Sequence, residues 1–375
     1  MDQGNTAFVL ISAALVLLMT PGLAFFYGGM VKAKSVVSMM MLSFGSLGLI
    51  GVLWVLYGYA VAFSNGTIDG KANPNFFGID GIFGIDTSFI GLGAQVADAT
   101  APTGAYPSLA FVAFQATFAI ITVALISGAI ADRAKFGAWM VFAGVWATLV
   151  YFPVANWVFN FTLADGKIVD GGWIVKDIGA IDFAGGTAVH INAGAAGLAL
   201  AIVLGKRFGF SKGIMQPHNV PLTLLGTALL WFGWFGFNAG SEVAADGIAS
   251  LAFINTMAAP AAAMLGWILI EKLKHGKATS IGAASGAVAG LVAITPACAS
   301  LTPLWAMVLG VLAGVLCALA VDLKFKFGFD DSLDVVGIHL VGGIVGTLFI
   351  GLFGTGVGLL QTGSWNQLAA QAIGA

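Results

Sequence analysis

The chain has 375 residues, of which 59% are hydrophobic and 9% are charged, and its formal net charge at pH 7 is -2. Because soluble domains carry about 25% charged residues, this composition excludes a large soluble fold and indicates an integral membrane protein. The small negative net charge also argues against a basic surface for nucleic acid. No long charged run or linker divides the sequence, so we expect one membrane domain over residues 1–375.

A helix needs about 20 mainly apolar residues to cross a bilayer, and about ten runs of that kind recur along the chain. We therefore predict an all-α, polytopic membrane protein. The final stretch, "LLQTGSWNQLAAQAIGA", has the start of an eleventh helix but is too short to cross. The predicted helices span, in chain order, about 7–31, 36–63, 108–131, 137–160, 183–204, 220–241, 249–270, 281–298, 304–322 and 335–355.

The basic residues are distributed unevenly between the two sets of loops. Of the 15 Lys and Arg residues, 12 fall in loops that follow odd-numbered predicted helices. Positive residues are retained on the cytoplasmic side, so these loops are predicted inside and the N-terminus outside, in a multi-pass protein of the plasma or inner membrane. The 12 residues are Lys32, Lys34, Arg133, Lys135, Lys206, Arg207, Lys212, Lys272, Lys274, Lys277, Lys324 and Lys326; Lys71, Lys167 and Lys176 share the opposite loops with Asp69, Asp80, Asp86, Asp98, Asp165, Asp170 and Asp177.

Two similar motifs suggest an internal repeat. "HINAGAAG" begins at His190 in the fifth predicted helix and "HLVGGIVG" begins at His339 in the tenth. Because five is an odd number, equivalent helices of two five-helix halves run in opposite directions, which is the pattern of an inverted repeat with a pathway between the halves. We expect pseudo-repeats over about 7–204 and 220–355, and the small residues of both motifs predict close helix packing.

The two histidines are the candidate pathway residues, because an ionisable side chain at membrane depth is a functional hypothesis. His190 follows Asp182 by about 12 Å of helix and His339 follows Asp334 by about 7.5 Å, so the rings meet only if they reach toward each other. The alternatives are packing histidines or axial ligands of a haem. Asp182 is either a helix cap or a charge that favours a cation on the outer side, and Asp334 is interpreted as a cap.

Aromatic residues mark a second candidate region. In "WFGWFGFNAGS", Phe237 and Ser241 are spaced four residues apart and share a helix face near the predicted outer end. In "AFQATF", Phe114 and Phe118 have the same spacing. Such rows commonly face lipid, but a ring beside a hydroxyl suits a small cation, with about 0.5–2 kcal/mol for each cation–π contact.

These stretches resemble the ammonium transporter (Amt/Mep/Rh) family, specifically its bacterial Amt branch. The similarity covers essentially the whole chain in order, and "DFAGGTAVHINAG" is specific on its own. The other segments that carry it are "AFFYGGM", "AFQATFA", "GKRFGFSKGIMQPHNVP", "WFGWFGFNAGS", "TPAC" and "DVVGIHLVGGIVG".

The resemblance implies an eleven-helix inverted-repeat fold, a homotrimer with a separate pore in each subunit, and a transporter with neither enzymatic activity nor a cofactor or metal. The family's twin pore histidines correspond to His190 and His339, and its stacked phenylalanine gate corresponds to Phe118 and Phe237. Its external ammonium site corresponds to Phe118 and Ser241, and its buried acid to Asp182. Trp234, in the same motif as Ser241, is assigned to the external site as well.

The sequence departs from the family in two places. Where the family has a tryptophan that completes the external cation cage, this chain has Phe159, with Trp157 two residues earlier as the alternative. The family's last helix and cytoplasmic tail are absent, so the eleventh helix is expected to be missing or truncated. Regulation by PII-type signal proteins depends on that tail and is correspondingly in doubt.

The expected mechanism follows from the cost of burying charge. Ammonium is captured outside, loses its proton near the phenylalanine gate and crosses as ammonia past His190 and His339, with a separate proton relay along the imidazoles. Burial disfavours a charged imidazole, so both rings are expected to be neutral. Methylammonium is an expected alternative substrate. The alternative hypotheses are an Rh-like ammonia channel, an ammonium sensor and a haem protein with two histidine ligands.

Overall fold

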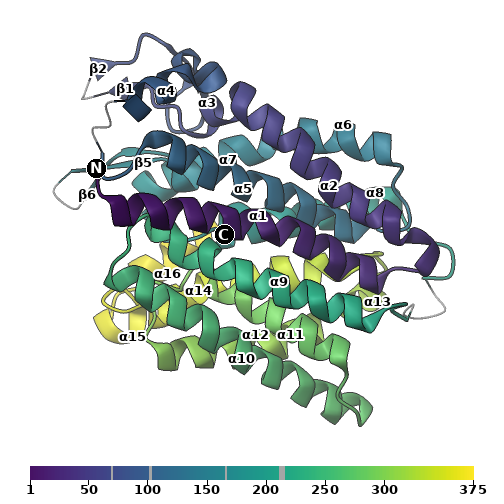
Figure 1. The fold of residues 1–375 in the computed structure, drawn as a ribbon. Helices are drawn as coiled ribbons and strands as arrows, with labels where there is room; N and C mark the ends of the chain where they lie inside the picture. Colours follow the sequence, from purple (N-terminus) through teal and green to yellow (C-terminus); the bar gives the residue numbers. More distant parts are fainter. Residues whose placement is uncertain (69–70, 101–103, 165–166, 211–215) are drawn as a thin grey trace.

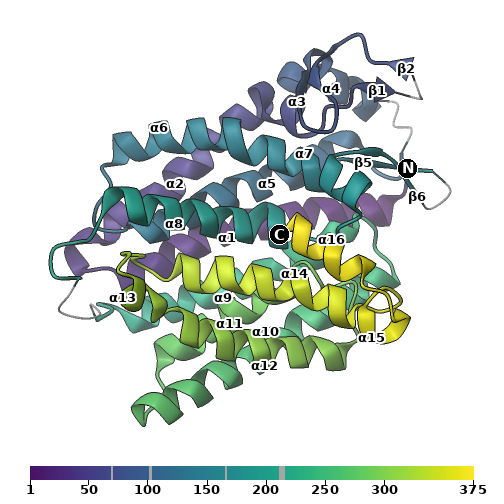
Figure 2. The same ribbon diagram turned by 180° about the vertical axis from the view of Figure 1, so that it is seen from behind.

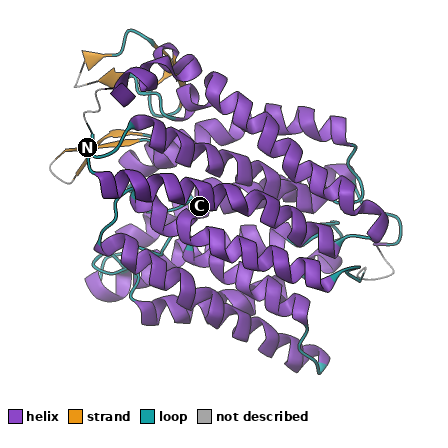
Figure 3. Ribbon diagram, in the orientation of Figure 1, coloured by secondary structure: helices purple, strands orange, loops and turns teal. Residues whose placement is uncertain are grey.

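The computed structural model describes residues 1–68, 71–100, 104–164, 167–210 and 216–375 as a bundle of long helices that run side by side (Figures 1 and 2). Figure 3 shows that strands are confined to one end of the bundle. The helices are α1 (Gln3–Met30), α2 (Val36–Leu53), α3 (Tyr59–Ala62), α4 (Gly93–Thr100), α5 (Ser108–Ile126), α6 (Phe136–Trp146), α7 (Phe152–Phe159), α8 (Asn192–Leu204), α9 (Val220–Ala239), α10 (Gly247–His275), α11 (Ser280–Ile294), α12 (Pro303–Ala320), α13 (Leu323–Phe327), α14 (Val341–Phe353), α15 (Leu359–Thr362) and α16 (Asn366–Gly374).

The predicted membrane helices are confirmed as helices. Within the part of the chain that the structure describes, nine helical segments are long and apolar enough to cross a membrane, and α11, with 15 residues, is shorter than the prediction of 281–298. Several spans join consecutive helical segments. The nine spans are Gln3–Met30, Ala33–Ala62, Ser108–Ile130, Phe136–Phe159, Gly186–Leu204, Val220–Glu242, Gly247–His275, Pro303–Phe327 and Val336–Phe353.

The ends of α10 show why one predicted boundary was wrong. The Asp246 carboxylate caps the helix by accepting hydrogen bonds from Ile248 N at 2.9 Å and Ala249 N at 3.0 Å. The helix ends only at Gly276, in the left-handed conformation with φ +75. Lys272 and Lys274, predicted to lie in a loop, therefore lie in the last turn, where cations interact favourably with the exposed carbonyl groups.

In the described parts of the loops on the predicted outer side, the chain forms three short antiparallel hairpins that the sequence did not predict. They lie at the end of the bundle that also carries the N-terminus (Figure 1). Lys212, Asp69 and Asp165, which entered the charge argument, lie outside the described residues, as does the 211–215 part of a family motif. The strands are β1 (Thr67–Ile68) with β2 (Lys71–Ala72), β3 (Phe76–Ile79) with β4 (Phe83–Asp86), and β5 (Phe161–Ala164) with β6 (Lys167–Gly171).

Glycines let the helices that follow the two histidines pack closely against their neighbours. A Cβ added at Gly194 in α8 would lie 2.5 Å from Leu340 N, and one added at Gly346 in α14 would lie 2.0 Å from Ala293 O. Both contacts are with backbone atoms, which a side chain cannot displace cheaply. Gly197 and Gly342 are less tight, with a nearest neighbour 3.1 Å away in each case. The predicted close packing at the small residues is therefore confirmed.

Candidate substrate pathway

Both histidines lie in a short π-helical turn immediately before a membrane helix. His190 lies in the turn Gly186–Ile191 before α8, and His339 lies in the turn Val336–Leu340 before α14. Each turn is preceded within one or two residues by a left-handed residue, Gly185 with φ +113 and Asp334 with φ +64. Each turn therefore begins just after a residue in the left-handed conformation, which Gly and Asp adopt more readily than most residue types.

A carboxylate organises the start of the turn that carries His190. The Asp182 carboxylate accepts four backbone hydrogen bonds, from the N–H groups of Gly185, Gly186, Thr187 and Ala188, at 2.8, 2.5, 2.8 and 3.1 Å. Four donors on one carboxylate satisfy the N–H groups that every helix start leaves without a partner. The capping interpretation of Asp182 is therefore confirmed.

The corresponding acid of the second motif is Asp331, and the prediction that Asp334 is the cap was wrong. The Asp331 carboxylate accepts from Val336 N at 2.7 Å, whereas the Asp334 carboxylate accepts from Lys324 Nζ at 2.5 Å. Burial and the nearby Asp334 raise the pKa of Asp331 to about 7. Asp331 precedes His339 by eight residues, as Asp182 precedes His190, and this shared spacing was the signal that could have found it.

The two imidazole rings are in direct contact. His190 Nδ1 and His339 Nδ1 are 3.2 Å apart, and the ring centroids are separated by 5.3 Å at an interplanar angle of 26°. The side chains are almost completely buried, with 1% and 4% exposure. The Nε2 atom of His190 is buried without a hydrogen-bond partner among the described residues. The rings, which the sequence places in contact only if they reach toward each other, do meet, and one hydrogen-bonding position on His190 has no partner among the described residues.

A pair of stacked phenylalanine rings lies directly next to the histidine pair. The Phe118 and Phe237 rings stack at 4.1 Å with an interplanar angle of 16°, and both side chains are buried. The Phe237 ring centroid lies 6.1 Å from that of His190. Because α9 carries Phe237 and α5 carries Phe118, the stack joins the two halves of the chain at this point.

Phe159 and Ser241 each contact one member of the Phe stack. The Phe159 ring meets the Phe118 ring edge-on at 6.1 Å. The Ser241 hydroxyl donates to Phe237 O at 2.8 Å, which leaves its oxygen able to accept a hydrogen bond from a cation. Trp157 donates to Ile82 O at 2.5 Å and its ring contacts Trp173 at 5.7 Å. Of the two aromatic candidates, Phe159 is the one with a recorded ring contact to Phe118 in the described part of the chain.

Trp234, predicted to belong to the external site, lies beside both the Phe stack and the histidine pair, since its ring centroid is 5.6 Å from that of Phe237. Its ring stacks against His190 at 5.4 Å, and its indole N–H donates to Thr295 Oγ1 at 2.8 Å. Trp234 therefore packs against the histidine pair, and its part in an external site stays a prediction. Along α9, Trp234 precedes Phe237 by about 4.5 Å of helix, whereas Ser241 follows Phe237.

One buried residue near the pathway was missed by the sequence analysis. Gln371, in the C-terminal helix α16, accepts from Ile181 N at 2.6 Å and donates to Ile181 O at 2.8 Å and to Thr347 O at 3.1 Å. Its amide thus connects the residue before Asp182 with α14. No local pattern predicts this pairing, because its partners lie 190 and 24 residues away in the sequence.

The side chains of the described residues offer no group of three or more His, Cys, Asp or Glu placed to hold a metal ion. Cys298 and Cys317 are free and buried, as expected for inert thiols. The arrangement therefore combines a polar and aromatic region, a pair of stacked aromatic rings and a pair of hydrogen-bonded imidazoles with aromatic neighbours. Such an arrangement suits a small polar molecule that passes between helices.

The Ammonium Transporter Family model matches residues 7–375. The chain belongs to the ammonium transporter family. The ammonium transporter of Mycobacterium tuberculosis strain H37Rv is 58% identical over 389 aligned residues, which cover 100% of this chain and 81% of the relative. The ammonium transporter of Bacillus subtilis is 48% identical over 356 residues, covering 95% of this chain and 81% of the relative.

Solved structures of ammonium transporter family proteins have the same fold. The crystal structure of Saccharomyces cerevisiae Mep2 has a TM-score of 0.85 at 34% identity, covering 100% of this chain and 81% of that one. A structure described as a sensor Amt protein has a TM-score of 0.86 at 28% identity, covering 99% and 88%. The polytopic membrane fold is confirmed, and membership of this family supports ammonium transport.

Proposed function

We propose that this ammonium transporter family member captures ammonium at an outer site, removes its proton near the Phe118–Phe237 stack and conducts ammonia past His190 and His339. The observation that carries the proposal is the imidazole pair, in contact at 3.2 Å directly behind the stacked rings. Phe118, Phe159 and Ser241 form the proposed capture site. Asp182 contributes negative charge on the same side in addition to its capping role.

The energetics of burial favour deprotonation over passage of the ion. Moving a bare ion of this size into a low-dielectric interior costs of order 20 kcal/mol in the idealised limit and several kcal/mol after relaxation. Cation–π contacts of about 0.5–2 kcal/mol each do not offset that cost. A neutral polar molecule costs only about 2–7 kcal/mol without a partner, and the imidazoles supply partners. Potassium ions, which cannot lose a proton, are therefore excluded.

The hydrogen bond between the rings gives them complementary roles. In a neutral pair, one Nδ1 carries the proton that the other accepts, so one Nε2 is an acceptor and the other is a donor. The Nε2 of His190, which has no recorded protein partner, is the proposed position for hydrogen bonding to ammonia. A proton that moves across the Nδ1–Nδ1 contact would leave by this separate route, and transport would then carry net charge.

We further propose the arrangement of the chain in the membrane. Residues 1–375 form one membrane domain of two inverted pseudo-repeats, about 7–204 and 220–355, with the N-terminus outside and the basic loops inside a plasma or inner membrane. A homotrimer with one pathway per subunit is the proposed assembly. Support comes from the basic loops and from the matching carboxylate-to-histidine spacing of the two halves. Regulation of transport by a PII-type signal protein depends on a cytoplasmic tail, so we propose it only for a protein that carries such a tail.

A second candidate function is ammonium sensing, which the similarity to a sensor Amt protein favours. In that case the outer site would bind ammonium without substantial flux. An Rh-like channel would instead conduct ammonia without net charge. The distance between the two imidazoles disfavours the hypothesis of a haem protein. An iron with its porphyrin would have to lie between two ring nitrogens that are in hydrogen-bond contact at 3.2 Å.

The test is a current measurement on protein reconstituted into liposomes. We expect a dose-dependent, voltage-sensitive current with ammonium and none with potassium. His190→Ala should abolish the ammonium current, whereas His275→Ala, which replaces an exposed histidine at the end of α10, should preserve it. Equal currents with potassium and ammonium would refute the mechanism. Ammonium binding without flux would favour the sensor, and uptake without current would favour the channel.

A further inference from the structure

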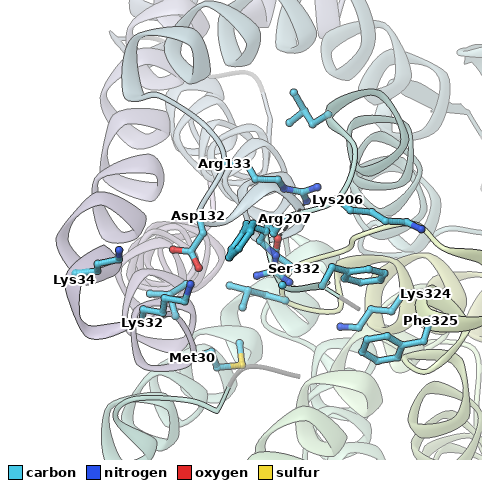
Figure 4. Close-up of a pocket in the computed structure, with 16 residues that line it drawn as sticks. Met30, Lys32, Lys34, Asp132, Arg133, Lys206, Arg207, Lys324, Phe325 and Ser332 are labelled. Atoms are coloured by element: carbon cyan, nitrogen blue, oxygen red, sulfur yellow. Dashed lines mark hydrogen bonds between the residues drawn. The ribbon is translucent and has the colours of Figure 1, made fainter. Parts of the chain in front are cut away.

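A basic pocket lies at the end of the bundle opposite the hairpins. Its cavity volume is about 560 Å³, within the range of about 300–1,000 Å³ typical of small-molecule sites. Figure 4 shows Lys32 and Lys34 on one side, Lys206 and Lys324 on the other, and arginine side chains between them. The pocket is lined by the ends of segments from both halves of the chain, and Asp132 is the acidic residue among its lining residues.

Part of this positive charge is neutralised within the protein. Arg207 pairs with Asp330 through Nη2 at 2.8 Å and Nε at 2.9 Å, and Lys324 pairs with Asp334 at 2.5 Å. Arg133 is 3.9 Å from the same Asp330 carboxylate, so two guanidinium groups share one acid. The single Asp330 carboxylate therefore does not neutralise both guanidinium groups.

Arg133 also has an unused donor. Its side chain is 90% buried, since only 10% of it is exposed, and its Nε has no hydrogen-bond partner in the described part of the chain. Its Nη atoms donate to Gly205 O, Ala129 O and Asp330 O, and to Ser332 Oγ at 3.2 Å. A buried cation with an unpaired donor is costly unless an anion is close. Arg133, which lines the cavity, therefore places a largely buried positive charge beside it.

Three exposed lysines complete the basic wall. Lys32, Lys34 and Lys206 have no ion pair within 4 Å among the residues that the structure describes. The positive-inside rule explains why lysines lie in these loops, but it does not require them to surround a cavity with a buried arginine at its floor. Arginine and lysine together are the usual partners of phosphate groups, because they combine planar donors with compact positive charge.

From this geometry we propose that the pocket binds a phosphate group from the cytoplasmic side, with Arg133 at the floor and Lys32, Lys34 and Lys206 at the wall. The phosphate belongs to a free phosphate, to a soluble phosphate ester or to a lipid headgroup at the membrane surface. The floor also includes Ser332 and Leu333, which directly follow Asp331, the cap of the turn that carries His339. Binding of phosphate in the pocket would therefore affect the turn that carries His339.

The proposal is tested by titrating inorganic phosphate into purified protein at constant ionic strength, with calorimetry as the readout. The pocket variant replaces Lys32, Lys34 and Lys206 by alanine. The matched control replaces Lys135, Lys272 and Lys277, three lysines of the same face that do not line the pocket. Each exposed ion pair contributes about 1.4- to 5-fold in affinity. Because the pocket variant removes three lysines, it should bind phosphate at least about threefold more weakly than the wild type. The affinity of the control variant should stay within about twofold of the wild-type value.

The source of the phosphate is distinguished in a second arm, in nanodiscs of phosphatidylcholine with and without phosphatidic acid. If phosphatidic acid competes with inorganic phosphate in the wild type and not in the pocket variant, the ligand is a lipid headgroup. If inorganic phosphate binds equally in both nanodiscs, the ligand is soluble. Absence of saturable phosphate binding, or equal weakening in the pocket and control variants, would overturn the proposal. The binding measurement does not depend on transport, so it stands apart from the proposed function.

Discussion

Replacing Asp182 by asparagine separates the structural role of this residue from an electrostatic one. In the native protein, Oδ1 accepts from Gly185 N and Gly186 N, and Oδ2 accepts from Thr187 N and Ala188 N. An asparagine keeps one oxygen, so it satisfies one pair of donors and turns an N–H₂ group toward the other pair. The backbone that begins the His190 turn would then lose half of its capping hydrogen bonds.

The expected cost follows from the number of donors left without a partner. A buried donor that loses its acceptor costs about 1–3 kcal/mol, so two such donors amount to about 2–6 kcal/mol. Asp182→Ala leaves all four donors unpaired and should be more destabilising still. Asp331→Asn provides a comparison, since one backbone hydrogen bond to that carboxylate, from Val336 N, has a recorded length of 2.7 Å. The expected order of destabilisation is Asp182→Ala, then Asp182→Asn, then Asp331→Asn.

The measurement is the thermal unfolding of each variant in detergent, together with the ammonium concentration that gives half-maximal current. If capping dominates, the unfolding temperature falls in the order given and the half-saturating concentration of the folded fraction changes little. An Asp182→Asn protein with the unfolding temperature of the wild type would refute the capping argument. If such a protein bound ammonium more weakly, the charge of Asp182 rather than its hydrogen bonds would be what matters.

Three other substitutions test separate parts of the structure. Phe159→Trp offers a better cation–π partner beside Phe118 and should lower the half-saturating ammonium concentration about 2- to 5-fold, corresponding to about 0.5–1 kcal/mol; an unchanged value would remove Phe159 from the capture site. Gly346→Ala puts a Cβ 2.0 Å from Ala293 O and should destabilise by about 1–3 kcal/mol, whereas Gly48→Ala, with no atom within 4 Å of its Cβ, should not. Thermal unfolding in detergent compares the two, and equal stability would contradict the packing argument. For Asp331, a folded pKa raised to about 7 means that its stabilising contribution is complete below about pH 4 and is lost progressively until the pH passes about 7. Between pH 4.5 and pH 8, the unfolding temperature should therefore fall more steeply in the wild type than in Asp331→Asn. If the unfolding temperatures of the two proteins changed with pH in parallel, the raised pKa of Asp331 would be contradicted.

The helices were predictable because a bilayer imposes a length and a composition on any segment that crosses it. The histidine pair was predictable because the same motif occurs in both halves of the chain. The contact of Trp234 with His190 was not predicted, because its motif was treated as one site, although residues three positions apart are separated by about 4.5 Å along a helix. Asp334 was chosen because it is the acid nearest in sequence to His339, whereas the spacing of the first motif selects Asp331.

Other features had no local signal in the sequence. The hairpins of the outer loops have strands of two to five residues, too short for an alternating pattern to identify. Gln371 pairs with a peptide group 190 residues away, which only the folded chain reveals. The basic residues of the inner loops were predicted as a group, but their convergence on one cavity depends on where five separate segments end.

The contact between α8 and the turn that carries His339 has a mechanical consequence. At Gly194 the α8 backbone lies close to that turn, because a Cβ at this position would lie 2.5 Å from Leu340 N. Rocking one half of the protein against the other would have to separate these closely packed backbones. Under the proposed function, this packing favours a pathway whose walls keep their positions while the substrate passes.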